Sequence, residues 1–277
     1  MSSKEYNEQA GLRWSSLAPG VQSGLQLAHE RDHGREDTAA LGLGRVVHVA
    51  ALEPAGVTVQ LVPSEHLTPS GSLSTGAKTK TWAKECAAAG MEFTTPADLA
   101  TAVQIAAALR RHPAAADTLD ACPVREVPVY ATVDGVPGKC CPDLYDPKTG
   151  ILADLKTHSG RGRFSVRSVV AAMQAYRYPG QMAWYRRVML AAGLAVSEVR
   201  LVFVDTAAPH DVIVLRLSED WLAYGDSLVD TALANLAAVQ SGVVQGVAPA
   251  IVEPDLPAWL ADTADSSDVD DLGLEGM

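Results

Sequence analysis

Aromatic residues, cysteine and long apolar runs are all scarce in this sequence. Phe, Trp and Tyr make up 5% of its 277 residues, and no apolar run approaches the roughly 20 residues that cross a bilayer. The segment from Met1 to Gln9 is polar and lacks the apolar stretch of a signal peptide. These absences argue against a membrane-spanning or secreted protein and predict a cytoplasmic one. With 48% hydrophobic residues, the chain can still bury the core of one large domain.

The four cysteines show neither a metal-binding nor a disulfide pattern. Cys86, Cys122, Cys140 and Cys141 lack the paired spacing of a zinc site, and adjacent cysteines seldom belong to one disulfide framework. We therefore expect all four to be small core residues.

Negative charge dominates the composition but is unevenly distributed. The net charge of −11 argues against a nucleic-acid-binding protein. Residues 253–277 hold eight acids and no base, so the remaining residues carry 22 bases against 25 acids. From Leu155 to Ser197 there is no Asp or Glu, but there are seven bases: Lys156, Arg161, Arg163, Arg167, Arg177, Arg186 and Arg187. Because a solvated face usually mixes both signs, this segregation favours contact with a phosphate backbone.

A β-hairpin is predicted around the segment from Asp146 to Gly150. This segment holds turn-forming residues, and apolar, β-compatible residues flank it on both sides. A hairpin centred between Lys148 and Thr149 places Asp143 opposite Asp154, with their side chains roughly 5 Å apart. Two facing carboxylates repel each other, so the pair needs a positive group between them.

Alternation along the second strand separates a polar face from an apolar one. Asp154 and Lys156 share one face with Leu152, whereas the other face is wholly apolar and needs a core: Ile151, Ala153 and Leu155. Mg²⁺ takes carboxylate oxygens and keeps waters or phosphate oxygens as its other ligands, and a nearby lysine can orient water or neutralise phosphate charge. The alternative is an exposed hairpin with a surface Asp–Lys pair of little energetic value.

These hairpin residues resemble the PD-(D/E)XK nuclease signature. Pro142-Asp143, followed by Asp154-Leu155-Lys156, carries the resemblance. The flanking sequence is similar to the RecE-like phage and prophage exonucleases, which are related to exodeoxyribonuclease VIII and to the RecB nuclease domain. Four further segments, over roughly residues 12 to 240, carry this closer resemblance: Gly44 to His48 with Leu52 to Pro54; Arg111 to Pro113; Glu126 ahead of Gly138-Lys139; and Tyr178 to Tyr185.

The resemblance implies an α/β fold: a mixed central β-sheet flanked by helices, with an N-terminal helical portion. We expect one nuclease domain over residues 1–250, helical at about 12–115 and catalytic at about 116–245, and a disordered acidic tail at 251–277. Periodicity and turn residues predict helices at about 16–31, 38–52, 81–89, 96–111, 166–176, from 178, and 218–240. They predict strands at about 57–63, 126–132, 136–144, 151–157, 198–205 and 211–217.

The resemblance also implies a metal centre for one or two Mg²⁺ ions, which Mn²⁺ can replace. The expected ligands are His48, Glu126, Asp143, Asp154 and the carbonyl of Leu155. By residue type alone, a histidine in an apolar helix is more often a core residue, and Glu126 could equally be a charge at a strand edge. Iron–sulfur relatives carry three cysteines after the nuclease motif; none follows Cys141 here, so we expect no cluster.

Lys156 and Gln181 complete the implied catalytic set with Asp143 and Asp154. Lys156 would orient or activate the attacking water, and Gln181 would bind DNA or orient the lysine. Gln181 and Tyr185 lie four residues apart and match the family's Gln-x-x-x-Tyr pair, although interface packing would explain them equally well. The expected DNA contacts are Arg161, Arg163, Arg167, Tyr178, Gln181 and Tyr185.

The predicted function is that of a Mg²⁺-dependent exodeoxyribonuclease acting on the ends of linear double-stranded DNA. The resemblance further implies 5′-to-3′ resection, a RecT-like single-strand annealing partner and a ring-shaped homo-oligomer, in a bacterium or a phage-infected cell. Two alternatives stay open. One is another RecB-like nuclease, CRISPR-associated or acting in repair, that cuts single-stranded ends. The other is a non-catalytic protein that binds DNA ends or mimics DNA.

Overall fold

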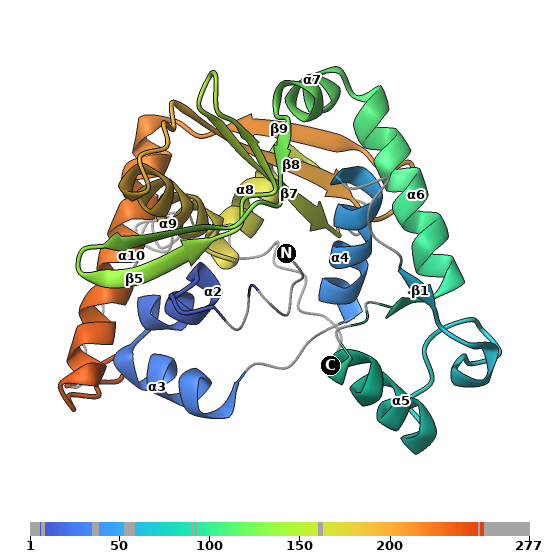
Figure 1. The fold of residues 1–277 in the computed structure, drawn as a ribbon, viewed down its shortest axis with the longest axis horizontal. Coiled ribbons are helices and arrows are strands. Elements are labelled where there is room, and N and C mark those ends of the chain that lie inside the picture. Colours follow the sequence, from blue (N-terminus) through green and yellow to red (C-terminus); the bar gives the residue numbers. More distant parts are fainter. Residues whose placement is uncertain are drawn as a thin grey trace, which may run out of the picture.

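A five-stranded mixed sheet forms the centre of the computed structural model (Figure 1). The structure describes residues 6, 9–34, 39–52, 59–89, 91, 93–159, 163–248 and 250–251. The strand order is β3-β6-β7-β8-β9, in which β7 and β8 are parallel and the other neighbours antiparallel. The strands are β3 (Val124–Arg125), β6 (Leu144–Asp146), β7 (Ile151–His158), β8 (Glu198–Asp205) and β9 (Val212–Arg216). The predicted α/β fold with a mixed central sheet is confirmed.

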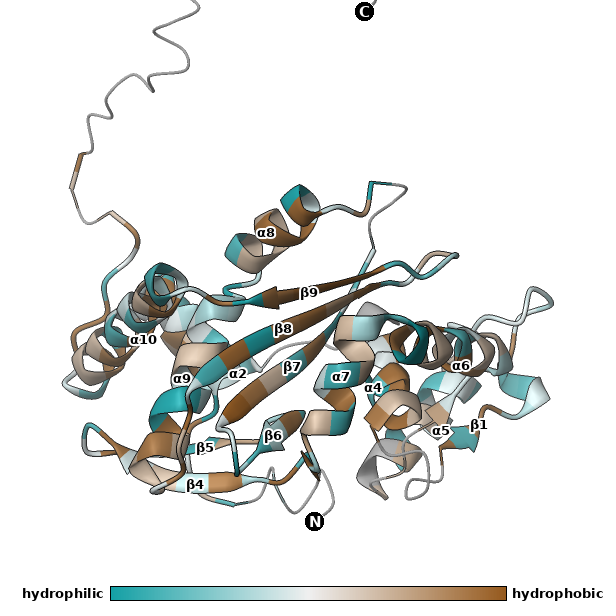
Figure 2. Ribbon diagram, turned by 90° about the horizontal axis from the view of Figure 1, so that it is seen from above, coloured by the Kyte–Doolittle hydropathy of each residue, from teal (hydrophilic) through white to brown (hydrophobic). Residues whose placement is uncertain are grey.

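Helices cover both faces of the sheet, as Figure 2 shows from above. One side holds α4 (Ala39–Leu52), α6 (Pro96–Arg111) and α7 (Pro113–Ala121). Their apolar side chains cluster with Ala153 and Leu155, the face of β7 that was predicted to need a core. The other side holds α8 (Val166–Ala175), α9 (Tyr178–Ala191) and α10 (Glu219–Gln240), which bury Leu152 of β7 and Phe203 of β8. Because successive side chains of β7 point to opposite faces, the strand contributes to two separate hydrophobic cores.

The hairpin of β6 and β7 has the predicted register. Leu144 pairs with Ala153 and Asp146 with Ile151, so Asp143, one residue before β6, lies opposite Asp154. The carboxylate of Asp146 closes the turn, because it accepts hydrogen bonds from the backbone N–H groups of the next residues: Lys148 at 3.0 Å and Thr149 at 3.2 Å. Turn chemistry and register thus agree.

The segment from Val136 to Leu144 is two strands and not the single strand predicted. β5 (Val136–Cys140) pairs with β4 (Val129–Val133) in a separate two-stranded sheet, and only β6 pairs with β7. The strand predicted over residues 126–132 begins later, as β4 at Val129, because β3 ends at Arg125 and Glu126 turns the chain with a φ of +49°.

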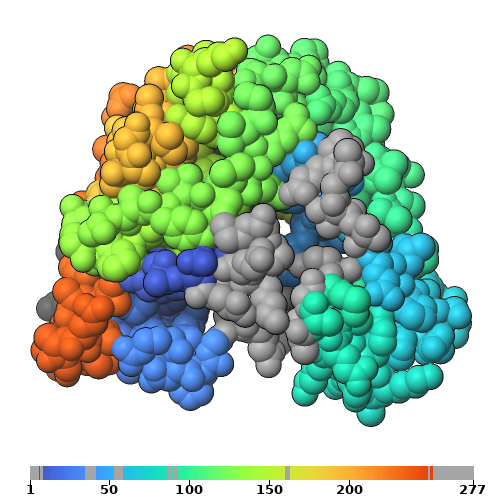
Figure 3. Space-filling model, in the orientation of Figure 1, coloured from blue at the N-terminus to red at the C-terminus, as the bar shows by residue number. Residues whose placement is uncertain are grey.

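Tertiary contacts draw β5 away from the central sheet. The Leu12 N–H donates to the Pro137 carbonyl at 2.8 Å, and the Lys139 N–H donates to the Leu12 carbonyl at 2.9 Å. Figure 3 shows the N-terminal residues, in dark blue, directly beneath β4 and β5. On α9, Trp184 approaches so closely that a Cβ on Gly138 would lie 2.8 Å from the indole ring. These partners occupy β5 in place of β7.

The N-terminal half contains more breaks than the periodicity predicts. The helix predicted over residues 16–31 is divided into α2 (Trp14–Leu17), a 3-10 turn at Ala18–Val21, and α3 (Gly24–His33). Pro19 disfavours a continuous helix, and the Ser23 side chain caps α3 by accepting the Gln26 N–H at 3.0 Å. The helix predicted from residue 81 begins earlier, as α5 (Ala77–Ala88), and the strand predicted over 57–63 shortens to β1 (Gln60–Leu61), which pairs with β2 (Phe93–Thr94).

One helix was not predicted from the sequence. This helix, α7, follows α6 directly, because His112 ends α6 and its side chain caps α7. The acidic tail predicted over residues 251–277 lies outside the described residues from 252 onward, so the proposed domain boundary at 250 stays a prediction. Within the described ranges, no helix is long and apolar enough to cross a bilayer.

Candidate metal and catalytic centre

The register of β6 and β7 buries two carboxylates side by side. Asp143 is 7% exposed and Asp154 is 1% exposed, so neither can rely on bulk water to stabilise its charge. The Asp143 Oδ2 atom accepts the backbone N–H of Leu155 at 2.6 Å, which fixes the carboxylate against β7. Burial and the charge of Asp154 together raise the pKa of Asp143. A buried pair of this kind favours an added cation.

His48 of α4 lies close to the Asp143 carboxylate and to the backbone of β7. Its neighbours Val46 and Val47 pack into the core and so direct α4 towards β7. His48 Nε2 lies 3.1 Å from the Leu155 carbonyl oxygen, while Nδ1 lies 3.5 Å from Asp143 Oδ1 and 3.6 Å from Glu126 Oε1. Burial alone would lower the pKa of His48, but the Asp143 charge and the hydrogen bond to Glu126 raise it to about 9.

Glu126 reaches this centre because the chain turns sharply after β3. Its φ of +49° lies in the left-handed region, and its N–H donates to the Pro142 carbonyl at 3.1 Å. One ligand atom each from His48, Glu126 and Asp143 lies within 4.8 Å of the other two. Three segments far apart in the sequence thus meet around one point, beside the Leu155 carbonyl.

The donor chemistry of this cluster fits a divalent cation. It offers carboxylate oxygens, a backbone carbonyl oxygen and one imidazole, the ligand types that suit Mg²⁺ and Mn²⁺. Asp154 Oδ2 is buried. Among the described residues it accepts no hydrogen bond of acceptable geometry, although it forms an ion pair with Lys156. All five ligands expected from the sequence lie in this region; the carboxylate of Asp154 is directed towards Lys156 and Gln181.

Lys156 and Gln181 form a second polar group against Asp154. The Lys156 ammonium donates to Gln181 Oε1 at 3.0 Å, and Gln181 Nε2 donates to Asp154 Oδ1 at 3.1 Å and to the Tyr185 hydroxyl at 3.1 Å. Burial would lower the pKa of Lys156, but the charges of Asp154 and Asp143 raise it overall. Lys156 is therefore an ammonium ion at neutral pH, held in place by the carboxylate and the amide.

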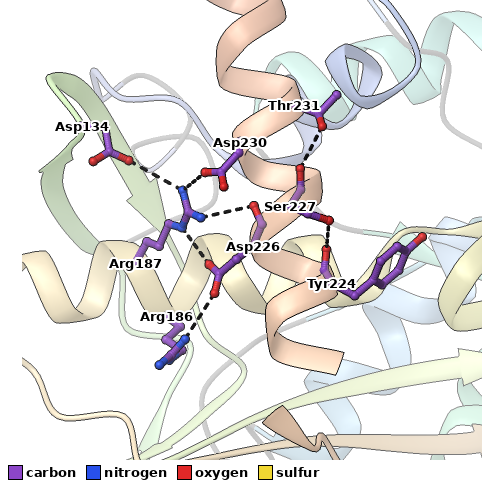
Figure 4. Close-up of polar contacts among 8 residues, drawn as sticks. All are labelled: Asp134, Arg186, Arg187, Tyr224, Asp226, Ser227, Asp230 and Thr231. Atoms are coloured by element: carbon purple, nitrogen blue, oxygen red, sulfur yellow. Dashed lines mark hydrogen bonds and ion pairs between the residues drawn. The ribbon is translucent and has the colours of Figure 1, made fainter. Parts of the chain in front are cut away.

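The basic segment from Leu155 to Ser197 does not form one phosphate-contacting surface. Arg187 on α9 contacts Asp226 at 2.8 Å and Asp230 at 2.7 Å, both on α10, and Asp134 in the β4–β5 turn at 3.6 Å (Figure 4). Arg186 contacts Asp226 at 3.4 Å. These two arginines tie three elements together, so the charge pattern alone overestimated the surface open to DNA.

The other bases of that segment divide in the same way. Arg177 donates to the Ala18 carbonyl at 3.1 Å and has a structural role. Arg163 and Arg167 are exposed and stay candidate DNA contacts, whereas Arg161 lies outside the described residues. Tyr178 lies beside the centre, because its ring centroid is 4.8 Å from Lys156 Nζ.

A pocket beside Gln181 and Tyr185 involves residues that the sequence did not single out. It measures about 270 Å³ and brings N-terminal residues to the centre; its lining residues are Tyr6, Arg13, Trp14, Ser15, Cys141, Gln181 and Tyr185. Arg13, Trp14 and Ser15 follow directly on Leu12, whose backbone hydrogen-bonds to β5. No local pattern indicates a contact between residues 13–15 and residue 181, so only the tertiary structure could find them.

We predict that the metal-free protein loses stability as pH rises from about 5 to 9 and that a divalent ion reverses the loss. The pKa values of Asp143 and His48 are both raised on folding, so the folded state binds more protons in this range and the free energy of unfolding falls as pH rises. The stability that His48 contributes is complete below its ordinary pKa of 6.5 and is lost as pH rises through about 9. Binding a cation requires both groups to be deprotonated.

Thermal unfolding in EDTA, and then with Mg²⁺ or Mn²⁺, measures this at pH 6 and pH 8. The metal-induced rise in Tm should be larger at pH 8, and Asp143→Asn should reduce it. Asp211→Asn is the matched control, because Asp211 is exposed and distant in sequence from the cluster. Equal rises at both pH values, or an unchanged rise in Asp143→Asn, would contradict the assignment of this cluster.

Comparisons with known proteins identify a family and a shared fold. Residues 23–249 match a family model described as "PDDEXK-like domain of unknown function (DUF3799)". The crystal structure of a "Putative exonuclease" from Eubacterium rectale matches with a TM-score of 0.61 and 15% identity, covering 96% of this chain and 99% of that one. That of a phage-related exonuclease from Haemophilus somnus matches with a TM-score of 0.36 and 14% identity, covering 87% and 99%. No curated protein matches the chain.

Proposed function

Because the chain belongs to the family described as a PDDEXK-like domain of unknown function (DUF3799), we propose that it is a divalent-metal-dependent deoxyribonuclease. The membership confirms the resemblance carried by Pro142-Asp143 and Asp154-Leu155-Lys156. One observation supports catalysis above the others: ligand atoms of His48, Glu126 and Asp143 meet within 4.8 Å of one another. A scaffold that only binds DNA has no physical need to bury mutually repelling carboxylates.

The residues around the cluster would divide the work of phosphodiester hydrolysis. His48, Glu126, Asp143, Asp154 and the Leu155 carbonyl would hold the metal. When bound, a divalent ion supplies Lewis acidity that stabilises the charge developing on a phosphate. The chain's own residues then orient the water and the phosphate.

Lys156 would act as a positioned cation. Because its pKa is raised, it carries its proton at neutral pH and can donate hydrogen bonds to water or to a phosphate oxygen. Gln181 accepts from Lys156 and donates to Asp154, so it fixes the direction of the ammonium group. Tyr185 keeps its proton, since burial raises its pKa further, and its hydroxyl accepts from Gln181. The position of the Lys156 ammonium group thus depends on two neighbours, Gln181 and Asp154.

We further propose that the enzyme is an exonuclease acting on linear double-stranded DNA ends. The description of the Eubacterium rectale protein, whose fold the chain shares, as a "Putative exonuclease" supports exonuclease activity, whereas the preference for double-stranded ends rests on the sequence resemblance. Resection in the 5′-to-3′ direction, a ring-shaped homo-oligomer and a RecT-like annealing partner rest on the sequence resemblance, as do DNA contacts by Arg163, Arg167 and Tyr178. A RecB-like nuclease acting on single-stranded ends is the nearest alternative.

A cleavage assay on end-labelled linear duplex tests the proposal. Separate 5′ and 3′ labels, a closed circular duplex and a single-stranded oligonucleotide are each incubated with Mg²⁺, Mn²⁺ or EDTA. We expect metal-dependent loss of the linear duplex with the 5′ label released first, and no loss of the circle. Cutting of circles would indicate an endonuclease, and cleavage of the single strand alone would favour the alternative. Retention of DNA without any cleavage would overturn the proposed activity.

A further inference from the structure

Tyr176 presents an exposed aromatic ring beside the candidate centre. Tyr176 is 63% exposed, although aromatic side chains in folded proteins usually bury much of their apolar surface. The ring stacks on that of Tyr178, with centroids 5.6 Å apart and an interplanar angle of 28°. The Tyr178 ring thus packs against one side of the Tyr176 ring, while much of Tyr176 remains open to solvent.

The backbone between α8 and α9 creates this stacked pair. Arg177 has a φ of +57°, in the left-handed region, and its guanidinium donates to the Ala18 carbonyl at 3.1 Å. Tyr176 is the C-cap residue that follows α8, while Tyr178 is the first residue of α9. A continuous helix would turn residues two apart to different faces, so the break is what brings the rings together.

Tyr178 connects the exposed ring to the catalytic residues. Its ring lies 4.8 Å from Lys156 Nζ and 6.0 Å from the ring of Phe203, which is fully buried. Lys156, Tyr178 and Tyr176 therefore form a row that leads from the candidate centre to solvent. Phe203 supports the middle member, so the row has few ways to rearrange.

We propose that Tyr176 is a stacking site for an unpaired nucleobase of the DNA strand whose phosphate lies at Lys156. Aromatic side chains beside a cationic group are the usual elements of single-strand recognition, since every base has a stacking face. The inference rests on the proposed nuclease function and adds that the end must be unpaired at the centre.

Binding without cleavage tests the site independently of the enzyme's activity. The probe is oligodeoxythymidylate carrying one 2-aminopurine, placed in turn at each position from the end, with EDTA or Ca²⁺ present. Wild type should quench the fluorescence of 2-aminopurine at one or two positions through stacking. Tyr176→Ala should lose this quench and bind about tenfold more weakly, whereas Tyr176→Phe, which keeps the ring, should retain both.

Tyr224→Ala is the matched control, because Tyr224 is also an exposed tyrosine with an aromatic neighbour, on α10. Tyr176→Leu separates stacking from simple coverage of Tyr178: if it restores quenching and affinity, the inference is wrong. Equal behaviour of Tyr176→Ala and Tyr224→Ala also overturns it. If wild type quenches the probe but never cleaves DNA in Mg²⁺, the stacking site stands and the proposed nuclease activity fails.

Duplexes with blunt and with single-stranded ends separate the two origins of an unpaired base. If the protein must melt the end itself, Tyr176→Ala should slow cleavage of blunt duplex more than cleavage of duplex with a pre-formed overhang. An equal loss on both substrates indicates that the stacked base is already unpaired when it arrives. Unchanged cleavage on both would contradict the inference.

Discussion

Lys156→Met is expected to lower the cleavage rate about 10³-fold while the protein stays folded and still binds DNA. Methionine keeps an unbranched apolar side chain of similar length but removes the ammonium that lies over the Tyr178 ring and contacts Asp154 and Gln181. The loss should appear in kcat, because the ammonium interacts more strongly with the charge that develops during reaction than with the bound substrate. Single-turnover cleavage of labelled duplex gives the rate constants of the variant and of wild type, and Tm measured in parallel shows whether the variant is folded.

Lys148→Met is the matched control for this experiment. Lys148 is exposed in the turn of the same hairpin, only a few residues away in sequence, so the substitution removes the same charge from the same element. Its cleavage rate should match that of wild type. If Lys156→Met kept more than a tenth of wild-type activity, Lys156 would have no role in the chemical step, and the centre would need another assignment.

Gly225→Ala is expected to lower the free energy of unfolding by about 2–3 kcal/mol. Gly225 lies in α10 where that helix crosses the first turn of α9, and a Cβ there would lie 2.3 Å from the Pro179 carbonyl oxygen and 3.1 Å from the Ala183 side chain. The clash involves backbone, so a whole helix must shift. For a domain of this size the change corresponds to a fall in Tm of roughly 4–12 °C.

The same substitution should also reduce activity, because α9 carries Gln181 two residues beyond Pro179. Gly42→Ala is the control: Gly42 lies within α4, and apart from its chain neighbours and the backbone of that helix, no atom of the described residues is within 4 Å of the position that its Cβ would take. There, alanine should stabilise by about 0.5–1 kcal/mol through helix propensity. A neutral Gly225→Ala would show that α9 and α10 are farther apart than the structure places them.

Local sequence was enough to predict the hairpin of β6 and β7. The turn chemistry of Asp146 to Gly150 sets the register of β6 and β7, and that register places Asp143 opposite Asp154. Capping residues likewise predict the starts of α6 and α10, where Thr95 and Ser218 accept backbone N–H groups. These features depend on residues a few positions apart, whose interactions hold in almost any surrounding fold.

Other predictions failed because their outcome depends on distant partners. The division of the segment from Val136 to Leu144 follows from contacts with Leu12 and Trp184, which no local pattern contains. The basic segment was overestimated for the same reason, since Asp226 and Asp230, about 40 residues downstream, pair with Arg187. Charge counts along a chain do not show which ions pair across it.

The sequence by itself determined the hairpin and the facing pair Asp143 and Asp154, because short-range turn chemistry and side-chain alternation encode both. The α/β class and the ligands His48 and Glu126 were expected from the family resemblance. The tertiary structure shows how closely His48, Glu126 and Asp143 converge, and it alone decided that Tyr176 stacks on Tyr178 beside Lys156 and that Arg187 faces α10. Such convergence is set by the packing of helices onto both sheet faces. That packing buries apolar surface wherever it occurs in the chain, and the polar groups follow the elements that carry them.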